Sequence, residues 1–424
     1  MTRPRPRFGC LEDWLSWQQT LHPRKIDLGL GRVRRVFERL LPRYRPPPTV
    51  TVAGTNGKGS CVALLDAVLR AAGYRVGAYT SPHLLRYNER IRIDGVPVSD
   101  REICAAFDRI DQAREGISLS FFEFATLAAL DLFQRAGVEV QLLEVGLGGR
   151  LDAVNVIDAD VAIVTSVDID HKEWLGEDRE AIGLEKAGVL RPGRPAIIGD
   201  RQPPASLLRY GAKLGARLFR LGRDFDHRLH GETWDWQDAD SRLEGLPLPA
   251  LPGRQQLDNA AVAVAALRKF SLPVAVDAIR AGLTRVHLPG RYQLIDGDPP
   301  VLLDVAHNPQ AVRLLSDYLA QRFPGRRILA LFAAMADKDI EGMLRQMKHR
   351  VALWALAPLP DNPRAASLER LHRAFAAEGL KTPLSGFADC RQALAALRRR
   401  ARPDDVIVVF GSFFLAAEVL ASDG

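Results

Sequence analysis

A glycine-rich loop that contains one lysine is the first feature of this sequence able to do chemistry. It lies between a strand expected at Thr49–Ala53 and a helix expected at Cys61–Ala72. Backbone N–H groups of such a loop can hold phosphate oxygens, and Lys58 can neutralise β- and γ-phosphates. A strict P-loop has Ser or Thr directly after the lysine, whereas Gly59 intervenes here. The alternative is a plain tight turn, but the strand–loop–helix context favours phosphate binding. The loop consists of Gly54, Thr55, Asn56, Gly57, Lys58, Gly59 and Ser60.

Two further polar groups follow apolar strands in the same half of the chain. Glu144 ends the strand that leads into Val-Gly-Leu-Gly-Gly-Arg-Leu-Asp152, and Asp168-Ile-Asp170-His171 follows another strand. Ligands of α/β proteins bind at the carboxyl ends of strands. A lone carboxylate there could be structural, but beside a phosphate loop Glu144 fits a magnesium ligand. Magnesium prefers oxygen ligands, so His171, considered alone, is more typical of a structural histidine.

A fourth cluster, Asp304-Val-Ala-His307-Asn308-Pro309, follows a strand in the C-terminal part of the chain. Asp304, His307 and Asn308 would form a polar pocket at the carboxyl end of that strand. The alternative is that these residues only cap the helix that begins near Pro309.

The elements that must position these residues alternate between strand and helix. This alternation predicts an α/β fold with a mostly parallel sheet. Residues 222–255 interrupt it, and we expect an antiparallel excursion or a long loop there. We expect an irregular stretch over Ser81–Asp100 and an N-cap at Ser99–Asp100. The other predicted strands of the first domain are Tyr74–Tyr79, Val138–Val145, Asp160–Val167 and Pro195–Ile198, and its other helices are 100–114, Phe121–Ala136, Asp178–Leu190, Leu257–Phe270 and Val274–Val286.

Turn-forming residues cluster near Leu288-Pro-Gly-Arg and Asp296-Gly-Asp-Pro-Pro300, where we place a domain boundary. Beyond it the alternation restarts, which predicts a second, smaller doubly wound domain. The expected domains are residues 1–290 and 300–424, joined by a linker over 291–299. The predicted strands of the second domain are Val301–Val305, Arg327–Phe332, Val351–Leu356 and Val406–Phe410.

Composition narrows the classes of protein. The chain has 424 residues, 47% hydrophobic and 26% charged, which excludes wholesale disorder. No apolar run reaches the ~20 residues of a transmembrane helix, and the basic start MTRPRPRF lacks the apolar segment of a secretory signal. Its four dispersed cysteines suit a reducing compartment. The net charge of +7 is spread along the chain, so nucleic-acid binding is not expected. We expect a cytoplasmic protein.

Together these motifs resemble the Mur ligase superfamily, and within it the bacterial bifunctional dihydrofolate synthase/folylpolyglutamate synthase family. The resemblance runs from about Asp27 to Ser412, in matching order and spacing. It implies a Mur-ligase-like P-loop ATPase domain followed by a smaller Rossmann-like domain. The motifs that carry it are Gly54–Ser60, Ser81-Pro-His-Leu, Tyr87-Asn-Glu-Arg-Ile, Glu144–Asp152, Asp170-His171 with Leu175-Gly176, Glu185-Lys186-Ala-Gly188 and Asp304–Pro309.

The resemblance also implies roles for individual residues. The implied magnesium ligands are Ser81, Glu144 and His171, which reverses the structural interpretation of His171. The implied ATP-binding residues, besides the loop, are Asn259, Arg291 and Asp304. The implied pterin-binding residues are Leu28, Gly29, Leu30, Phe122 and Asp152. His307 and Ser412 match positions that handle the incoming glutamate and the acyl phosphate. Lys186 matches a lysine that is carbamylated in relatives. One departure is that Lys172-Glu173-Trp174 follows His171, where a small polar residue is expected.

The activity implied is an ATP-dependent amide ligation of L-glutamate to dihydropteroate, and to tetrahydrofolate, through an acyl phosphate. Lys58 and magnesium would offset charge on the phosphates, and a closed cleft would protect the acyl phosphate from water. Asp304 or His307 would serve as the base or as an orienting group for the glutamate amine, without a choice between them. Lys58, Lys186, Asp304 and His307 are thus the expected catalytic residues. Small molecules are the expected partners of a monomer, without nucleic acid or membrane.

Three alternatives remain. A monofunctional folylpolyglutamate synthase would extend only tetrahydrofolate. A cell-wall Mur ligase would need a nucleotide-sugar domain before the loop, for which about fifty residues are too few. An ATP-binding regulatory switch would not need the Asp304–His307 pocket.

Overall fold

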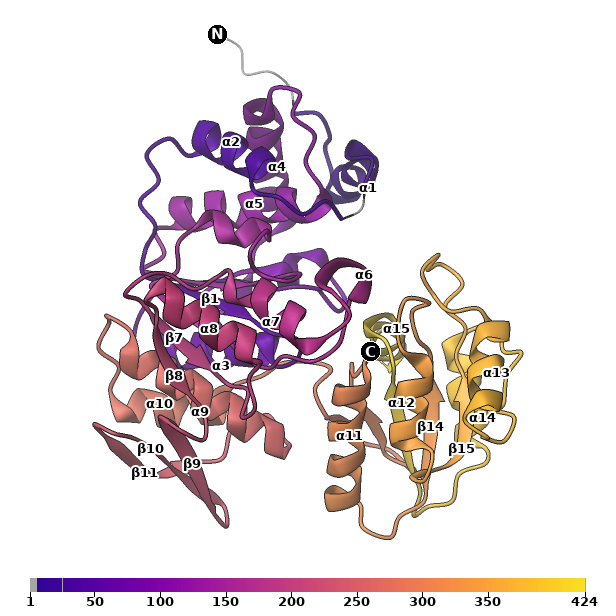
Figure 1. Ribbon diagram of the computed structural model, residues 1–424. Helices are drawn as coiled ribbons and strands as arrows, with labels where there is room; N and C mark the ends of the chain where they lie inside the picture. Colours follow the sequence, from indigo (N-terminus) through magenta and orange to yellow (C-terminus); the bar gives the residue numbers. More distant parts are fainter. Residues whose placement is uncertain (1–5, 25, 424) are drawn as a thin grey trace. The chain divides into compact units, whose positions relative to one another are not determined.

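The computed structural model describes residues 6–24 and 26–423, which form two compact units (Figure 1). The first comprises residues up to 250 together with 256–287, and the second comprises 251–255 and 288 onward. Residues 291–299, expected to be a linker, cluster with the second unit, and so do residues 288–290, which were expected to end the first domain. Most of the basic start of the chain, residues 1–5, lies outside the described residues. Both units are α/β, and the predicted fold class is confirmed.

The first unit is built on an eight-stranded sheet with the order β4-β3-β2-β5-β1-β6-β7-β8. The strands from β2 to β8 in this order are parallel, and β3 and β4 are antiparallel additions at one edge. The central strands are buried along their whole length because both faces of the sheet are covered. Their bounds are β1 Thr49–Ala53, β2 Val76–Tyr79, β3 Ile91–Ile93, β4 Val96–Pro97, β5 Val140–Glu144, β6 Val161–Val164, β7 Pro195–Ile198 and β8 Arg217–Arg220.

The N-terminal helices α1, α2, α4 and α5 gather on one side of this sheet (Figure 1). The helix after the glycine-rich loop, α3, packs against β2, β5 and β1 and is covered by α10. The helices and 3-10 turns are α1 Leu11–Leu21, α2 Gly31–Leu40, α3 Lys58–Ala71, η1 Tyr87–Arg90, α4 Asp100–Arg114, α5 Phe121–Ala136, η2 Ala153–Val156, α6 Lys172–Leu175, α7 Arg179–Ala187, α8 Ala205–Leu214, α9 Arg254–Lys269 and α10 Val276–Arg285.

Local capping explains the helix ends that the sequence predicted well. Ser99 and Ser120 each accept a hydrogen bond from the backbone N–H three residues later, in complete capping boxes. Gly137 ends α5 in the left-handed conformation, as expected. The expectation of irregular structure over Ser81–Asp100 was wrong in part, because η1, β3 and β4 lie within it. Strand β3 pairs with β2, and β4 pairs with β3; local sequence does not reveal these pairings.

Residues 222–255 contain a three-stranded antiparallel sheet, which confirms the predicted excursion rather than the loop. Its strands are β9 Phe225–His230, β10 Thr233–Asp238 and β11 Arg242–Pro247, in the order β11-β10-β9. Trp234 and Trp236 on β10 are fully buried. The indole N–H of Trp236 donates to the Ala261 carbonyl of α9 at 3.1 Å, so this sheet packs against the helix that carries Asn259.

Replacing Trp236 with alanine should lower the free energy of unfolding by about 3–5 kcal/mol. The substitution leaves a cavity at a fully buried position and removes the hydrogen bond to the Ala261 carbonyl. Urea denaturation followed by circular dichroism measures this change. Trp174→Ala is the matched control, since the Trp174 side chain is 42% exposed and its loss should cost under about 0.5 kcal/mol. Equal losses in both variants would contradict the packing described.

The second unit has a five-stranded sheet with the order β12-β13-β16-β14-β15, parallel except for β12 at the edge. The predicted alternation of strand and helix is confirmed, and β12 is an addition that the sequence did not reveal. Its elements are β12 Gln293–Ile295, β13 Val301–Leu303, α11 Pro309–Arg322, β14 Ile328–Phe332, α12 Ile340–Met347, β15 Val351–Leu356, α13 Leu368–Ala377, α14 Cys390–Arg398, β16 Val406–Phe410 and α15 Phe413–Asp423. Within the described ranges, every helix is too short or too polar to cross a membrane.

Candidate functional site

The glycine-rich loop connects β1 to α3, and α3 begins at Lys58 itself. Gly57 adopts the left-handed conformation with φ 88°, which an L side chain rarely tolerates. Neighbouring strand β6 supports the loop, since the Thr55 N–H donates to the Ser166 carbonyl at 2.8 Å and the Asn56 N–H donates to Ser166 Oγ at 3.0 Å. Lys58 Nζ donates to the carbonyls of Gly54 (3.0 Å) and Thr55 (3.3 Å). The loop is therefore curled around the ammonium group, at a helix N-terminus suited to anions.

Asn259, on α9, lies directly against this loop. A Cβ atom at Gly57 would lie 2.7 Å from Asn259 Oδ1, closer than real contacts permit. The Asn259 carbonyl oxygen also accepts a hydrogen bond from the Cys61 thiol of α3 at 3.7 Å, and its side-chain amide donates to Gln256 at 3.0 Å. The structure thus brings one of the expected ATP-binding residues to the loop.

Gly57→Ala should weaken nucleotide binding by about tenfold or more, because the new methyl group would push Asn259 and the loop apart. Calorimetric titration with ATP measures the dissociation constant. Gly73→Ala is a close control, since Gly73 has φ 89° and nothing lies within 4 Å of its added Cβ. Both variants should carry the same left-handed strain, of about 1–2 kcal/mol, so only steric contact at the loop separates them. Equal ATP affinity in the two variants would contradict this geometry.

Ser81 and Glu144 meet at the same edge of the sheet. Ser81 follows β2 and Glu144 ends the adjacent parallel strand β5, so the carboxyl ends of these strands lie together. The Ser81 N–H donates to Glu144 Oε2 at 3.2 Å, and Glu144 is only 4% exposed. A buried carboxylate beside a hydroxyl, next to a phosphate loop, fits the oxygen ligands of magnesium, which usually takes one or two carboxylates and completes its shell with water and phosphate.

His171 reaches this edge on the other side of the loop. The sheet order β2-β5-β1-β6 places the loop after β1 between the ends of β5 and β6, and Asp168–His171 follows β6. His171 has φ 51° and is the N-cap residue of α6, and its N–H donates to Asp170 Oδ1 at 2.8 Å. No group of three or more His, Cys, Asp or Glu in the described ranges has the arrangement of a metal site. The structure therefore brings Ser81 and Glu144 into contact and places His171 at a neighbouring strand end.

Lys186 lies on α7, near enough to Lys58, Asp170 and Asp152 for their charges to act on it. It is 3% exposed, and burial, reinforced by the charge of Lys58, lowers the pKa of its amine to about 7, against the opposing effect of the two aspartates. Burial also raises the pKa of Asp152 to about 7, although backbone N–H groups of Leu147 and Val154 donate to it. A lysine whose amine is partly neutral at pH 7 can act as a nucleophile, which an ordinary surface lysine cannot.

The glycines of the Gly146–Gly149 run permit close approach of other elements. A Cβ at Gly149 would lie 2.9 Å from the Glu185 carbonyl of α7, and one at Gly146 would lie 2.7 Å from the Phe122 ring of α5. These approaches bring α7, with Lys186, and α5, with Phe122, onto the segment that leads to Asp152. The glycines of this run are therefore needed partly because a side chain there would keep α5 and α7 away.

The expected pterin-binding residues come together around this segment. The Gly29 N–H donates to the Leu151 carbonyl at 3.2 Å, which holds the Leu28–Leu30 loop beside Asp152. The ring of Phe122 lies 5.7 Å from that of Tyr79 on β2. A loop from before α2, a ring from α5 and a buried carboxyl group therefore line one region of the first unit.

The second unit gathers the other expected site residues at the carboxyl end of β13. Asp304 is 5% exposed and accepts hydrogen bonds from the N–H groups of Tyr292 (2.9 Å) and Ala306 (2.8 Å). Burial raises the pKa of its carboxyl group, and the charge of Arg291 opposes that change. Asn308 caps α11, since the Ala311 N–H donates to its Oδ1 at 3.0 Å. The capping alternative thus describes Asn308, whereas Asp304 does not cap that helix.

His307, Arg291 and Ser412 surround Phe413 in the second unit. His307 Nδ1 donates to the Val305 carbonyl at 2.9 Å, and its ring lies 5.5 Å from that of Phe413. The guanidinium carbon of Arg291 lies 5.3 Å from the same ring. Ser412 is 2% exposed, and its hydroxyl oxygen accepts a hydrogen bond from the Phe414 N–H at 3.1 Å. All four expected residues of this unit therefore lie at one end of its sheet.

Sequence reasoning missed two sets of supporting residues. Thr165 and Ser166 hold the loop from β6, and Arg32 with Glu123 connects the Leu28–Leu30 loop to α5. The first set has a signal in the sequence, since hydroxyl residues directly follow the β6 run. The second has none, because the partners are distant in the chain.

Comparisons with known proteins bear on the family and the fold of this chain. The family model of the Mur ligase glutamate ligase domain matches residues 290–413. A dihydrofolate synthase/folylpolyglutamate synthase of Escherichia coli is 44% identical over 410 residues, which cover 97% of this chain and 94% of the relative. A structure of E. coli FolC in complex with DHPP and ADP is 43% identical, with a TM-score of 0.93 and 99% of each chain covered.

A crystal structure of a bifunctional folylpolyglutamate synthase/dihydrofolate synthase with Mn, AMPPNP and L-glutamate bound is 44% identical, with a TM-score of 0.91 and 99% of each chain covered. Identity at this level over nearly the whole length, together with the same two-unit α/β architecture, leaves no doubt about kinship. The chain belongs to the dihydrofolate synthase/folylpolyglutamate synthase family of Mur ligases.

Proposed function

We propose that this protein is an ATP-dependent ligase that joins L-glutamate to dihydropteroate and adds further glutamates to tetrahydrofolate. The observation that carries the proposal is the gathering of the glycine-rich loop, the Ser81–Glu144 pair and the Lys186–Asp152 pair within one unit of a chain from this family. Relatives of this name cover the chain almost completely. We propose a cytoplasmic monomer, in line with its small-molecule substrates.

The proposed reaction begins when the acceptor carboxylate attacks the γ-phosphate of ATP. Lys58 and the loop N–H groups would offset the charge that develops on the transferring phosphoryl group. The products of this step are an acyl phosphate and ADP. The glutamate α-amine then forms the amide bond, and phosphate leaves with the former carboxylate oxygen. The amine must lose a proton in this step, for which Asp304 or His307 is the proposed base or orienting group.

Magnesium is the proposed metal, with Ser81, Glu144 and His171 as its protein ligands. When bound, it would neutralise phosphate charge and align the γ-phosphate with the attacking carboxylate. Structures of relatives contain Mn with AMPPNP, which supports a divalent cation beside the nucleotide. The buried Ser81–Glu144 contact supports the first two ligands, and His171 remains the least supported.

Carbamylation of Lys186 is a proposed covalent modification of the site. A neutral amine attacks carbon dioxide, forms an N–C bond and releases a proton, which leaves a carboxylate-like group. The pKa of about 7 for Lys186 makes the neutral amine available at physiological pH. Such a group would carry a negative charge, so the Lys58 ammonium, whose charge acts on Lys186, would attract it.

The remaining residues are proposed to bind the nucleotide, the glutamate and the pterin, as the family resemblance implies. Asn259 is proposed to contact the nucleotide from α9, where it already lies against the loop. Arg291 and Asp304 are proposed ATP-binding residues of the second unit, and His307 and Ser412 are proposed to handle glutamate. Leu28, Gly29, Leu30, Phe122 and Asp152 are proposed to hold the pterin.

The test is ADP release by the purified protein with magnesium, ATP and glutamate, with either dihydropteroate or tetrahydrofolate as acceptor. Glutamate-dependent release with both acceptors is the expected result. Release with tetrahydrofolate alone would reduce the activity to that of a monofunctional folylpolyglutamate synthase. Release with neither acceptor would contradict the ligase and favour an ATP-binding switch.

A further inference from the structure

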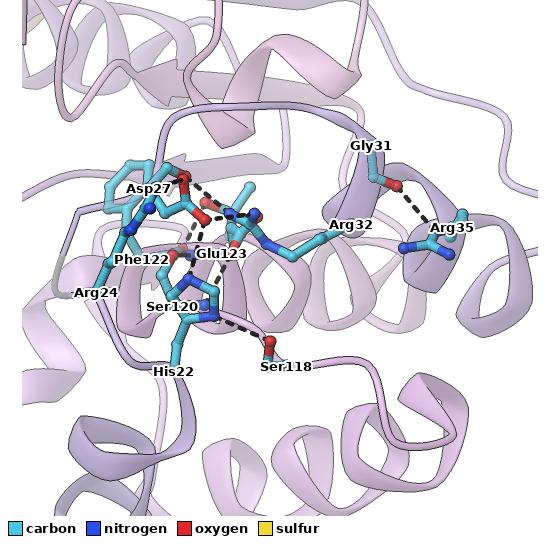
Figure 2. A network of polar contacts seen from close by, with 11 residues as sticks. His22, Arg24, Asp27, Gly31, Arg32, Arg35, Ser118, Ser120, Phe122 and Glu123 are labelled. Atoms are coloured by element: carbon cyan, nitrogen blue, oxygen red, sulfur yellow. Dashed lines mark hydrogen bonds and ion pairs between the residues drawn. The ribbon is translucent and has the colours of Figure 1, made fainter.

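A partly buried network of charges surrounds Arg32, on the first turn of α2 (Figure 2). Arg32 Nη1 donates to Asp27 Oδ2 at 2.6 Å, and Arg32 Nη2 donates to the Asp27 carbonyl at 2.8 Å. The same Nη2 lies 3.2 Å from Glu123 Oε1. His22 Nε2 donates to Asp27 Oδ2 at 3.0 Å. We call His22, Asp27, Arg32 and Glu123 the Arg32 network.

The network joins two segments that are distant in the sequence and adjacent to the proposed pterin site. Asp27 directly precedes the Leu28–Leu30 loop, and Glu123 directly follows Phe122. Glu123 is itself fixed, because its Oε2 accepts the Ser120 N–H at 2.7 Å in the capping box of α5. Arg32 is therefore the link between a loop with no regular structure and a rigid helix terminus.

A second contact holds the same two segments together. His22 Nδ1 lies 3.0 Å from Ser118 Oγ, in the turn that leads into α5, while its Nε2 binds Asp27. Asp27 is thus held from α2 by Arg32 and from the end of α1 by His22. Burial, which by itself raises the pKa of Asp27, is outweighed by the His22 hydrogen bond and the charges of Arg32 and Arg24, and the pKa is lowered.

The burial of Glu123 makes its partner important. Glu123 is 3% exposed, and Arg32 is the cation that lies beside it. In the described part of the chain, Arg32 Nε and Glu123 Oε1 are buried without a hydrogen bond. No further polar group in the network is therefore placed to replace Arg32 as the partner of Glu123 Oε1. Removing one member of a buried ion pair leaves an uncompensated charge, which is far more costly than losing an exposed pair. Without Arg32, the loop of residues 26–30 would move and let water reach the Glu123 carboxylate.

We propose that Arg32 is a positioning residue, which fixes the loop of residues 26–30 against the N-terminus of α5 and so sets the geometry of the folate-acceptor site. The inference rests on the proposed function for its substrate, but the link between the two segments stands on the contacts alone. Arg32 acts through Asp27 and Glu123, and no contact of Arg32 with the substrate is required.

The test compares Arg32→Met and Arg32→Lys with Arg35→Met. Arg35 lies on the same helix, is exposed and, among the residues that the structure describes, donates only to the Gly31 carbonyl at 3.4 Å, so it is a matched control (Figure 2). Arg32→Met should raise the KM for dihydropteroate, and its dissociation constant in calorimetry, by about tenfold. The kcat and the dissociation constant of ADP should stay within about twofold. Arg32→Lys should recover part of the loss, since it restores the charge without the two-pronged geometry.

A readout that does not need turnover separates this inference from the proposed function. Hydrogen exchange measured by mass spectrometry should accelerate in peptides that cover residues 26–31 and 118–124 of Arg32→Met, and not in peptides of the glycine-rich loop. If the parent protein fails to bind dihydropteroate, the proposed function fails, yet the exchange result still decides the positioning role. Unchanged exchange in both peptides would overturn the inference.

Double substitution provides the last check. Glu123→Gln keeps an oxygen for the Ser120 N–H but removes the charge, so it should restore part of the acceptor affinity that Arg32→Met alone loses. Additive effects of the two substitutions would overturn the proposed coupling. A general loss of acceptor binding, ADP binding and kcat together in Arg32→Lys would also overturn it, because that pattern indicates a merely structural role.

Discussion

Lys58→Met should reduce glutamate-dependent ADP release by about 10³-fold or more, with kcat affected more than the affinity for the acceptor. The lysine ammonium is held inside the loop by the Gly54 and Thr55 carbonyls, at the start of α3, and methionine keeps the length of the side chain without its charge. The loss is large because the charge would act on the phosphoryl group mainly as it transfers.

Steady-state assays of ADP release measure this effect, and Lys213→Met is the control. Lys213 is exposed on the last turn of α8, so its substitution should leave turnover unchanged. A Lys58→Met protein that retains more than about a tenth of the parent kcat would show that the loop does not stabilise the transferring phosphate. A second consequence is a rise in the pKa of Lys186, because the charge of Lys58 contributes to lowering it.

Lys186→Met should lower turnover by about 10²-fold or more, and the parent enzyme should lose activity in buffer stripped of carbon dioxide at low pH. Only the neutral amine reacts with carbon dioxide. Because burial lowers the pKa of Lys186 to about 7, the neutral form prevails above that pH and is depleted below it. Loss of carbamate should therefore begin as the pH falls through about 7, and added bicarbonate should restore activity.

The measurement is kcat against pH with and without bicarbonate, together with intact mass under native conditions. Lys381→Met, which removes an exposed lysine of the second unit, should match the parent enzyme in both buffers. Turnover of the parent enzyme that is independent of bicarbonate at every pH would contradict carbamylation. In that case Lys186 would act only as a buried amine next to Asp152 and Asp170.

Local capping residues and glycines at element ends explain which helices and strands could be predicted. The bounds of α5 were predicted to the residue because Ser120 with Glu123 forms a capping box and Gly137 ends the helix, all local signals. Strand β1 and the start of the loop were likewise marked by a β-branched run followed by glycine. By contrast, β3, β4 and β12 are short strands at or next to a sheet edge, and their existence depends on a pairing partner, so their own residues carried little signal.

The candidate site divides in the same way. Each chemical group was visible in the sequence, since Lys58, Glu144, Asp304 and His307 follow apolar strands. Their neighbours were not. That β5 lies between β1 and β2, and so brings Glu144 to Ser81, is a property of sheet order. That order depends on which strands bury the most surface together, which no window of sequence contains.

The sequence by itself determined the fold class, the family and the residue types that can bind phosphate and metal, because strand and helix periodicity and glycine-rich turns are encoded over a few residues. Only the tertiary structure decided the depressed pKa of Lys186, the contact of Asn259 with the loop and the link from Arg32 to Glu123. These features arise from burial and from long-range proximity. Both properties belong to the packed chain, since a charge is perturbed only by the groups that folding brings to it.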